Sequence, residues 1–473
     1  MSIAYKVEFD NKCEVNFSEM ISELFTRLMM FGREIVRDLL EETDEKLLEE
    51  RDKSRYRCKG SRKTTVKTKL GDIEYERRIY LDKEQGGHVF LLDEKINAHS
   101  VGLVDEEMCE SITDMICDMS FRKVAETISE TTGLSITHQG VWDIVQEQGR
   151  RKIEENKKLT KLAKEQKVKG SVETKILYEE ADGDWLKLQG EDRKKHGASK
   201  EMKVSIAYDG VLYHQAKKGS IRRELDNKVA YASFEGAEEF RKHKETVIAS
   251  KYNTDEIELR VKNGDGSQWI QKEPDCDCIC VLDEYHRNKK ITECVKDKQI
   301  AETLRDLLLK GQYQQLLDAI EAYINSLDDT AQVNKLKELY TYYSENFEAL
   351  PDYVSRGITI PETREPGVIH HARLGSMESN VFTLIGNRMK GRRACWSVNG
   401  GNNLAALLCS YHTSGSQYEI TDTSLSEKPI LSAAKVKKSE GKGYEIKQMY
   451  AVPSSMKWMK SIAQLKSFTD LKV

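Results

Sequence analysis

The chain has 473 residues, of which 33% are charged and 38% hydrophobic. This composition is typical of a globular protein with room for several domains. No apolar run approaches membrane-spanning length, and the N-terminus lacks the basic start and apolar core of a signal peptide, so we expect a cytoplasmic protein. The net charge of −4 argues against a nonspecific polyanion binder.

The first predicted elements are a helix and a basic hairpin. Apolar residues at helical spacing predict a helix over residues 16–51. Strands 64–70 and 73–80 follow, around a hairpin turn at Gly71-Asp72, and a short strand is expected at 88–92.

A basic run over residues 51–70 contains nine Lys or Arg and one Asp. Such a run is either a solvated face or a ribbon that contacts phosphates, and the sequence supports both interpretations equally. If the run binds DNA, the candidate contacts are Arg55, Arg57, Lys59, Arg62 and Lys63.

Residues 104–148 are predicted to be helical again. A short helix at 121–129, a glycine-containing turn and a second helix at 137–148 match the helix-turn-helix pattern. A purely structural helix pair is almost as well supported. If the pair binds DNA, Thr137 and Gln139 lie near the start of the reading helix. A Lys-rich helical connector is expected at 150–169.

The middle of the chain predicts a sheet. Strands are expected at residues 176–189, 201–212, 228–234, 256–261 and 278–282, with helices at 236–252, 267–272 and 285–294. Three strands followed by helix-linked strands predict an α/β fold with a mixed sheet and helices on both faces. That succession is the ribonuclease H-like order.

The sheet region is interrupted by a predicted helical block over residues 300–350, after which a helix is expected at 377–388. Six parts follow from these elements. They are an N-terminal helical and β-hairpin DNA-contacting region (1–100), a helix-turn-helix with its connector (101–170), the first part of the core (171–298), an all-helical insertion (299–360), the second part of the core (361–425) and a Lys-rich tail (426–473).

Strand 176–189 carries four acidic residues near its middle, Glu179, Glu180, Asp182 and Asp184. Carboxylates in a strand cost free energy unless they are paired or bound to a cation. Phosphodiester chemistry with two divalent cations needs carboxylates from separate elements, and magnesium prefers oxygen ligands. Asp182 is therefore the first candidate ligand.

The second ligand could be Asp265, at the end of a strand, or Asp283, after the next strand. Asp265 could equally be an ordinary turn residue, because Asn-Gly-Asp-Gly is typical turn chemistry. The third candidate is Glu378, whose alternative is a solvated residue near a helix start. His286 is either a capping histidine or an acid–base group beside the site.

The segments ADGDW, NGDGSQWI, VLDEYHRNKKI and GSMESNVFTLIGNRMKGRRACWS resemble the ISLre-type insertion-sequence transposases, a family first described as uncharacterised proteins. That family is similar in layout to Mutator-type DDE transposases. The resemblance implies that Asp182, Asp265 and Glu378 are the catalytic metal ligands, which favours Asp265 over Asp283. Asp283 and His286 match the family's D-x-x-H motif.

The resemblance also implies an activity: metal-dependent cleavage and strand transfer of double-stranded DNA, with Mg²⁺ or Mn²⁺, two ions, and a homo-oligomer on DNA. Residues expected to contact the DNA backbone are Arg388, Lys390, Arg392 and Arg393. Trp396 could stack on a base, although core packing is favoured. The alternatives are a non-enzymatic DNA-binding protein on the same scaffold and a nuclease that only hydrolyses.

Overall fold

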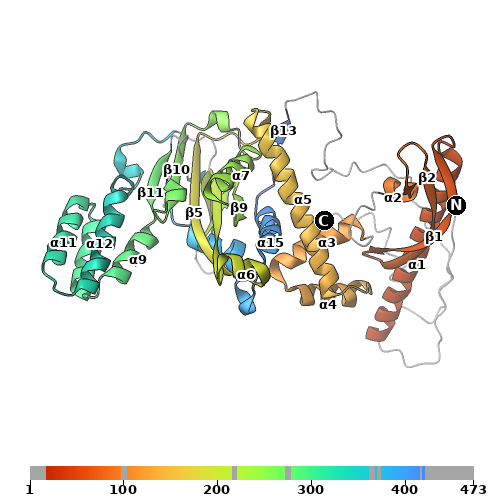
Figure 1. Cartoon of the computed structure of the whole chain (residues 1–473), viewed down its shortest axis with the longest axis horizontal. Helices are drawn as coiled ribbons and strands as arrows, with labels where there is room; N and C mark the ends of the chain where they lie inside the picture. The colour runs from red at the N-terminus through yellow and green to blue at the C-terminus, as the bar shows by residue number, and fades with distance from the viewer. Residues whose placement is uncertain are drawn as a thin grey trace. The chain divides into compact units, whose positions relative to one another are not determined.

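The computed structural model describes residues 17–96, 104–215, 221–271, 278–361, 368–369, 374–415 and 418–420. The chain divides into two compact units, residues 1–421 and 422–473, and all described residues lie in the first (Figure 1). Within these ranges, no helix is both long enough and apolar enough to cross a membrane.

The N-terminal elements are a long helix and an antiparallel hairpin. Helix α1 spans Phe17–Glu50, and strands β1 and β2 span Tyr56–Thr68 and Gly71–Asp82. The hairpin is confirmed, but its turn is not Gly71-Asp72. Thr68 pairs with Gly71, so Lys69 and Leu70 form the turn. Gly71 still matters, because its φ of 104° is a conformation that glycine adopts readily.

The hairpin continues into β3 (His88–Val89) and α2 (Leu91–Lys95), where a longer strand was predicted. Helix α1 packs on β2, and the buried Asp44 carboxylate accepts hydrogen bonds from the Arg78 amide at 3.2 Å and the Arg78 guanidinium at 2.7 Å. This ion pair fixes the helix on one side of the ribbon.

Three helices follow: α3 (Glu106–Asp118), α4 (Phe121–Thr132) and α5 (His138–Lys164). Thr137 caps α5 by accepting a hydrogen bond from the Gly140 amide at 3.1 Å. The predicted connector is not a separate helix, because α5 runs through it without a break.

The central sheet has five strands in the order β11-β10-β5-β6-β9. Strands β5, β10 and β11 are parallel to one another, whereas β6 runs antiparallel to both of its neighbours, β5 and β9. The mixed sheet is therefore confirmed, and Figure 1 shows β5 at its centre. The bounds are β5 Ile176–Lys187, β6 Ser199–Tyr208, β9 Val229–Ser233, β10 Leu259–Gly264 and β11 Ile279–Leu282.

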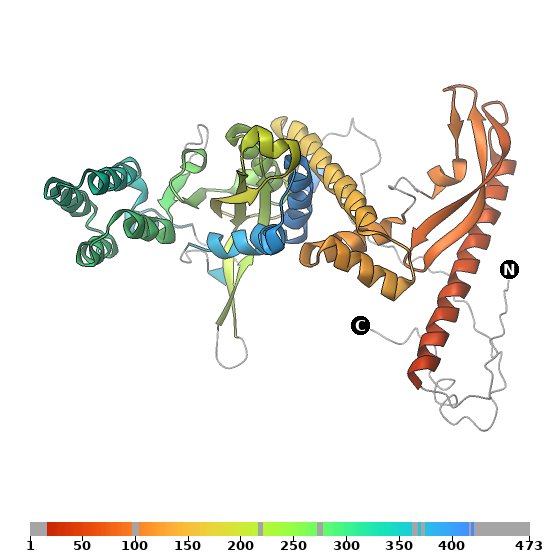
Figure 2. The same cartoon turned by 60° about the horizontal axis from the view of Figure 1, so that its bottom comes forward.

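A second hairpin was not predicted. The expected strand 201–212 breaks at Asp209, and β7 (Gly210–Gln215) pairs with β8 (Ile221–Asp226) and with the two-residue β12 (Val368–Ile369). Figure 2 shows this hairpin as a ribbon separate from the central sheet. A last short pair joins β4 (Val168–Gly170) to β13 (Tyr418–Ile420).

Helices cover both faces of the central sheet. Helix α7 (Ala237–Ala249) packs on the face that carries Leu177, Ala207 and Val229. The opposite face carries Tyr178 and packs against two helical segments. These are Met377–Met389, which is α13 and α14 joined by a π-helical turn, and α15 (Val398–Tyr411). The alternation along β5 thus sends neighbouring residues to different helical layers.

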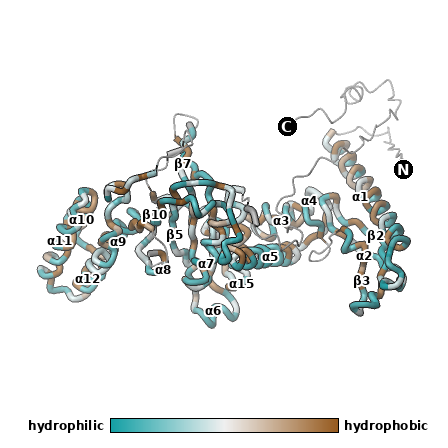
Figure 3. The backbone as a smooth tube through the Cα atoms, turned by 90° about the horizontal axis from the view of Figure 1, so that it is seen from above, coloured by the Kyte–Doolittle hydropathy of each residue, from teal (hydrophilic) through white to brown (hydrophobic). Residues whose placement is uncertain are grey.

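Helices α10 (Lys298–Leu309), α11 (Tyr313–Asn325) and α12 (Thr330–Glu345) lie in the segment expected to be helical, 300–350, and share a core with α9 (Glu284–Cys294), which precedes it. The short α8 (Gln268–Gln271) follows β10. Helix α6 (Gly190–His196) has no buried residue and is drawn in hydrophilic teal in Figure 3.

Candidate active site

Two acidic residues lie where the parallel pairing of β5 with β10 ends, although β5 itself continues to Lys187. On β5 and β10, Glu180 pairs with Asn263, and Ala181 pairs with Gly264. The next residues on these strands are Asp182 and Asp265, so the register places the two aspartates side by side. Ligand sites in such sheets form at the carboxyl ends of parallel strands.

Asp182, Asp265 and His286 form a compact group. Their ligand atoms lie within 4.8 Å of one another, and the Nε2 atom of His286 is 3.7 Å from Oδ2 of Asp182. The Asp265 carboxylate accepts hydrogen bonds from the amide and the hydroxyl of Ser267, both at 2.8 Å. Asp265 is therefore both a turn residue and a site residue. Gly266 completes the turn with a φ of 91°.

Glu378 belongs to the same groove but not to the compact group. It is exposed on α13 and lines a groove of about 670 Å³ together with Asp182, Asp265 and His286. A neighbouring cavity of about 280 Å³ is also lined by Asp182, His286 and Glu378. The three predicted acids thus meet around one opening, and His286 joins them as a fourth member.

The electrostatics of Asp182 reflect this crowding. Burial, together with the negative charges of Asp265 and Glu378, raises the pKa of Asp182 to about 6, although His286 and the Gly183 amide act in the opposite direction. A carboxylate that is costly to ionise beside two further acids is a place where a cation would lower the free energy.

The donor set fits a divalent cation. Two carboxylates are the hard oxygen ligands that magnesium prefers, and an imidazole nitrogen is also a good ligand for manganese. Asp182, Asp265 and His286 would hold the cation. Glu378 is the further carboxylate that lines the same groove.

Asp283, the other candidate for the second ligand, has a different position from Asp265. It is not a member of the compact group. Its Oδ1 atom caps α9 by accepting hydrogen bonds from the amides of Tyr285 and His286 at 2.9 and 3.1 Å, and its Oδ2 accepts one from Asn263 at 2.9 Å. Asp283 therefore orients α9, the helix that carries His286.

The remaining acids of β5 point to opposite faces. Glu179 is buried on the α7 face, where Lys244 and Arg260 pair with it at 2.7 and 3.0 Å. Burial alone would raise its pKa, but these two cations hold the pKa of Glu179 well below its usual range. Glu180 is buried on the α13 face and accepts hydrogen bonds from neutral donors.

Asp184, the fourth acid of β5, is buried and pairs with the half-exposed Lys390. Lys390 is thereby held at the groove wall next to the acids. Of the other residues expected to contact DNA, Arg393 is exposed, and the side chain of Arg392 lies outside the described residues.

Arg388 is not placed for a phosphate contact. It is partly buried between rings, with its guanidinium carbon 5.0 Å from the Phe121 ring centre and 5.8 Å from that of Trp396, and its Nε donates to the Ile116 carbonyl at 2.7 Å. Burial lowers its pKa to about 10. Trp396 is itself buried and stacks on Trp142 at 6.3 Å, so core packing rather than base stacking describes it.

The N-terminal candidates are mostly exposed. Arg57, Lys59, Arg62 and Lys63 are all exposed on β1. Arg55 is engaged instead, because its guanidinium donates to Asp82 at 2.9 and 3.1 Å. Thr137 and Gln139 are exposed at the start of α5.

Sequence reasoning missed several residues of the groove. Lys289 and Lys290 line it from α9, and the aromatic rings of Trp185 and Phe382 line it with 61% and 63% of their surface exposed. The sequence gives no separate signal for Trp185 on β5 or Lys289 on α9, because the groove is assembled from distant segments.

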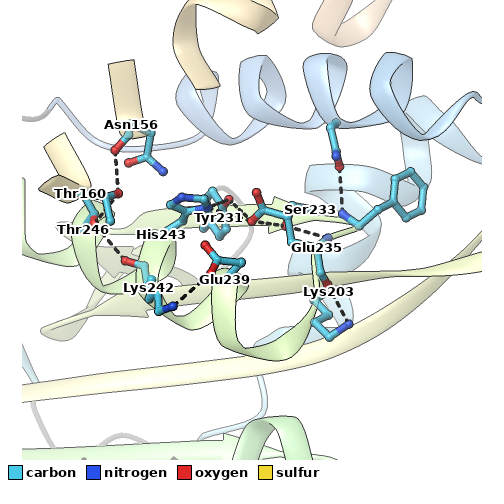
Figure 4. Close-up of polar contacts among 12 residues, drawn as sticks. Asn156, Thr160, Lys203, Tyr231, Ser233, Glu235, Glu239, Lys242, His243 and Thr246 are labelled. Carbon is cyan, nitrogen blue, oxygen red and sulfur yellow. Dashed lines mark hydrogen bonds and ion pairs between the residues drawn. The ribbon is translucent and has the colours of Figure 1, made fainter. Parts of the chain in front are cut away.

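Another polar cluster lies between β9 and α7, away from the groove-lining residues. One oxygen of Glu235 accepts hydrogen bonds from the Tyr231 and Ser233 hydroxyls at 2.8 and 3.1 Å and lies 2.9 Å from Nδ1 of His243 (Figure 4). These groups satisfy one another, so the cluster anchors the start of α7.

A family model described as "Uncharacterised protein family (UPF0236)" matches residues 11–422. The chain belongs to the UPF0236 family. The family description prints no activity.

Among the UPF0236 relatives, a protein of Caldanaerobacter subterraneus subsp. tengcongensis is 24% identical over 396 residues, which cover 82% of this chain and 79% of the relative. Its printed name joins eleven loci, and that of a further relative from the same organism, 22% identical over 396 residues, joins four. A Streptococcus gallolyticus protein, "UPF0236 protein in vanSb 3'region", is 21% identical over 429 residues, 86% of each chain.

Proposed function

We propose that the protein is the DDE-type transposase of a bacterial insertion sequence, which cuts and joins DNA with the help of divalent cations. One observation carries the proposal. Asp182, Asp265 and His286 come from three separate elements, yet their ligand atoms lie within 4.8 Å, in a groove that Glu378 also lines. Carboxylates gathered in this way are what two-cation phosphodiester chemistry requires.

The fold supports the same proposal. Three antiparallel strands followed by two helix-linked parallel strands, β5-β6-β9 and then β10 and β11, is the order expected of a ribonuclease H-like core. The helices α10, α11 and α12 would be its insertion, and α4 with α5 its helix-turn-helix. A cytoplasmic location, where the element's DNA lies, is part of the proposal.

In the proposed reaction, water attacks a phosphodiester at the element's end and breaks its P–O3′ bond, which leaves a 5′-phosphate and a free 3′-hydroxyl. That hydroxyl then attacks a phosphodiester of the target DNA, forms a new P–O3′ bond and releases the 3′-hydroxyl of the cut target strand. Bound cations would activate the attacking oxygen and stabilise the charge on the leaving one. Asp182, Asp265 and His286 would hold these cations, and Glu378 lines the same groove. Lys390, which pairs with Asp184, would contact a phosphate.

The copy number of the relatives is a second support. A single protein name that joins eleven loci of one organism describes a gene present in many nearly identical copies. Replicating or relocating mobile elements produce that pattern, whereas an ordinary DNA-binding regulator or housekeeping nuclease is expected at one or few loci.

The test is a strand-transfer assay with duplex oligonucleotides that end in the element's own termini. We expect nicking and joining with Mg²⁺ or Mn²⁺ and a loss of at least about a hundredfold in Asp182→Ala, Asp265→Ala and Glu378→Ala. Circular dichroism of each variant controls for folding. Undiminished strand transfer in all three variants would refute the proposal.

The same assay separates the two alternatives. Specific, salt-sensitive binding without cleavage in either metal would identify a non-enzymatic DNA-binding protein. Cleavage without any joined product, with paired ends and target supplied together, would identify a hydrolytic nuclease.

A further inference from the structure

We propose that Glu180 is the positioning residue of the acidic site: its buried carboxylate holds the segments that carry Asp182, Asp265 and Glu378 in one arrangement. The inference rests on the proposed function, because it concerns the same site. Glu180 itself lies below the groove, with none of its surface exposed, and is not among the groove-lining residues. It would act through its neighbours rather than on a substrate.

The hydrogen bonds of Glu180 reach three separate segments. Its Oε1 atom accepts from the Tyr208 hydroxyl of β6 at 2.7 Å. Its Oε2 atom accepts from the Asn263 amide group of β10 at 3.0 Å, and from the backbone amides of Gly375 and Ser376 at 2.9 Å each. The last two donors belong to the residues just before α13.

The pattern of these donors follows the acids. Asp182 lies two residues after Glu180 and Asp265 two residues after Asn263, and Glu378 lies two residues after Ser376. The hydrogen bonds from Asn263 and Ser376 therefore hold the chain two residues before Asp265 and Glu378, and Glu180 itself lies two residues before Asp182. The two amide hydrogen bonds anchor the residues just before α13, the helix that carries the exposed Glu378.

The network also extends to His286. The Asn263 amide group donates to Asp283 at 2.9 Å as well as to Glu180, and Asp283 caps the helix that carries His286. All four groups of the candidate site are thus connected to one carboxylate within a chain of hydrogen bonds. Partners of this kind orient metal ligands, and their loss commonly weakens metal binding by about 10- to 100-fold.

A carboxylate is the side chain that this position needs. Each of its partners donates a hydrogen, and an ionised carboxylate only accepts. Glutamine has the same shape, but its amide group would direct donors at the donors of Asn263, Gly375 or Ser376. The substitution Glu180→Gln therefore disrupts the network with almost no change in volume.

Glu179 provides a matched control. It is the adjacent residue on β5, is equally buried, and makes strong polar contacts, but with Lys244 and Arg260 on the opposite face of the sheet. The substitution Glu179→Gln breaks a buried ion pair and lowers stability without touching the site. A general loss of stability and a specific loss of positioning can thus be told apart.

The experiment measures Mn²⁺ binding by the full chain without DNA, from the electron paramagnetic resonance signal of free Mn²⁺, with thermal unfolding in parallel. We expect Glu180→Gln to weaken Mn²⁺ binding by about tenfold or more. Glu179→Gln should bind Mn²⁺ as the wild type does, despite its lower Tm. If Glu180→Gln does not fold, Tyr208→Phe replaces it, because it removes one donor and adds none, and it should show a smaller loss in the same direction.

Wild-type Mn²⁺ affinity in Glu180→Gln, or in Tyr208→Phe where that variant is used, would overturn the inference. Equal losses in the Glu179 and Glu180 variants would also overturn it, since they would follow stability alone. A wild-type chain that binds no Mn²⁺ would overturn it together with the metal site. A wild-type chain that binds Mn²⁺ through this network but joins no DNA would refute only the proposed function.

Discussion

At the scale of single residues, the ionisation of Asp182 opposes folding. Its pKa of about 6 in the folded chain lies above the ordinary value of 3.8. Because the pKa of Asp182 is raised on folding, its protonated carboxyl group contributes fully to stability below about pH 4, and this contribution is lost as the pH rises through about 6. Cation binding would offset this loss, because it favours the charged form.

Removing the charge should therefore stabilise the cation-free protein. We expect Asp182→Asn to exceed the wild type by up to roughly 3 kcal/mol at about pH 8 and to match it at about pH 4. Thermal unfolding in a chelator at both pH values measures the difference. Adding Mn²⁺ at the higher pH should raise the Tm of the wild type more than that of the variant, and a variant no more stable than wild type at high pH would contradict the expectation.

Arg388 and Lys390 lie two residues apart and should behave in opposite ways. Arg388→Ala removes a partly buried hydrogen bond to Ile116 and two ring contacts, so it should lower the free energy of unfolding by about 2 kcal/mol. Lys390→Gln should change stability less, because its amide group can still donate a hydrogen bond to the buried Asp184. It should instead reduce the salt dependence of DNA binding by about one phosphate contact. Urea unfolding measures the stability of the two variants, and fluorescence anisotropy at several salt concentrations measures their DNA binding. A stability loss confined to the Lys390 variant and a changed salt dependence confined to the Arg388 variant would contradict this prediction.

At the scale of elements, the helical insertion supports the site. The Tyr342 hydroxyl of α12 donates to the backbone carbonyl of Asp265 at 2.9 Å, whereas the Tyr343 hydroxyl donates to that of Arg287 at 2.8 Å. Tyr342→Phe should therefore weaken Mn²⁺ binding several-fold. Tyr343→Phe should lower the free energy of unfolding by about 1 kcal/mol and leave Mn²⁺ binding unchanged. Equal losses of Mn²⁺ affinity in the two variants would show that the insertion does not support the site through Tyr342.

Local patterns predicted the elements of the sheet well. Alternation and apolar runs located β5, β10 and β11, and helical spacing located α1 and the insertion. The β7–β8 hairpin was missed, although Asp209-Gly210 at the end of β6 is a local turn signal. Its pairing with β12 and the hydrogen bond that the Asn227 side chain donates to Asp209 at 3.1 Å are long-range contacts. Contacts between distant segments leave no periodic signature in the sequence.

The candidate site was predictable only in part, for the same reason. Asp182, Asp265 and Glu378 carried acidic or glycine signals in their own segments. The membership of His286 depends on the cap that Asp283 gives α9, and the role of Glu180 depends on donors from β6, β10 and the start of α13. Neither is visible without the register of the parallel strands.

At the scale of the whole molecule, charge is separated along the chain. The net charge is −4, yet β1 exposes a row of cations. We expect replacement of Arg57, Lys59, Arg62 and Lys63 by Gln to weaken duplex binding and to reduce the slope of log K against log salt by about three to four. Fluorescence anisotropy between low and moderate salt measures the slope.

The matched control removes the same number of charges from the insertion, through Lys298, Lys310, Lys335 and Lys337, all of them exposed. That variant should bind DNA with the wild-type slope. The other interpretation of the basic run is a solvated face without a role in binding. In that case both variants would give equal slopes.

The order of the acids along the chain has a consequence for synthesis. The hairpin and the helices α3 to α5 precede Asp182, whereas Glu378 comes near the end of the first unit. A growing chain can therefore complete the β1–β2 hairpin on the ribosome long before the last acid exists, but α3 and α5 share their core with α15, which follows Glu378. Contacts this distant in sequence form late in folding. In the proposed transposase, a product that stops before Glu378 would lack both the last acid and the helix that completes the core around α5, so shortened copies of the gene would give neither activity nor a complete fold.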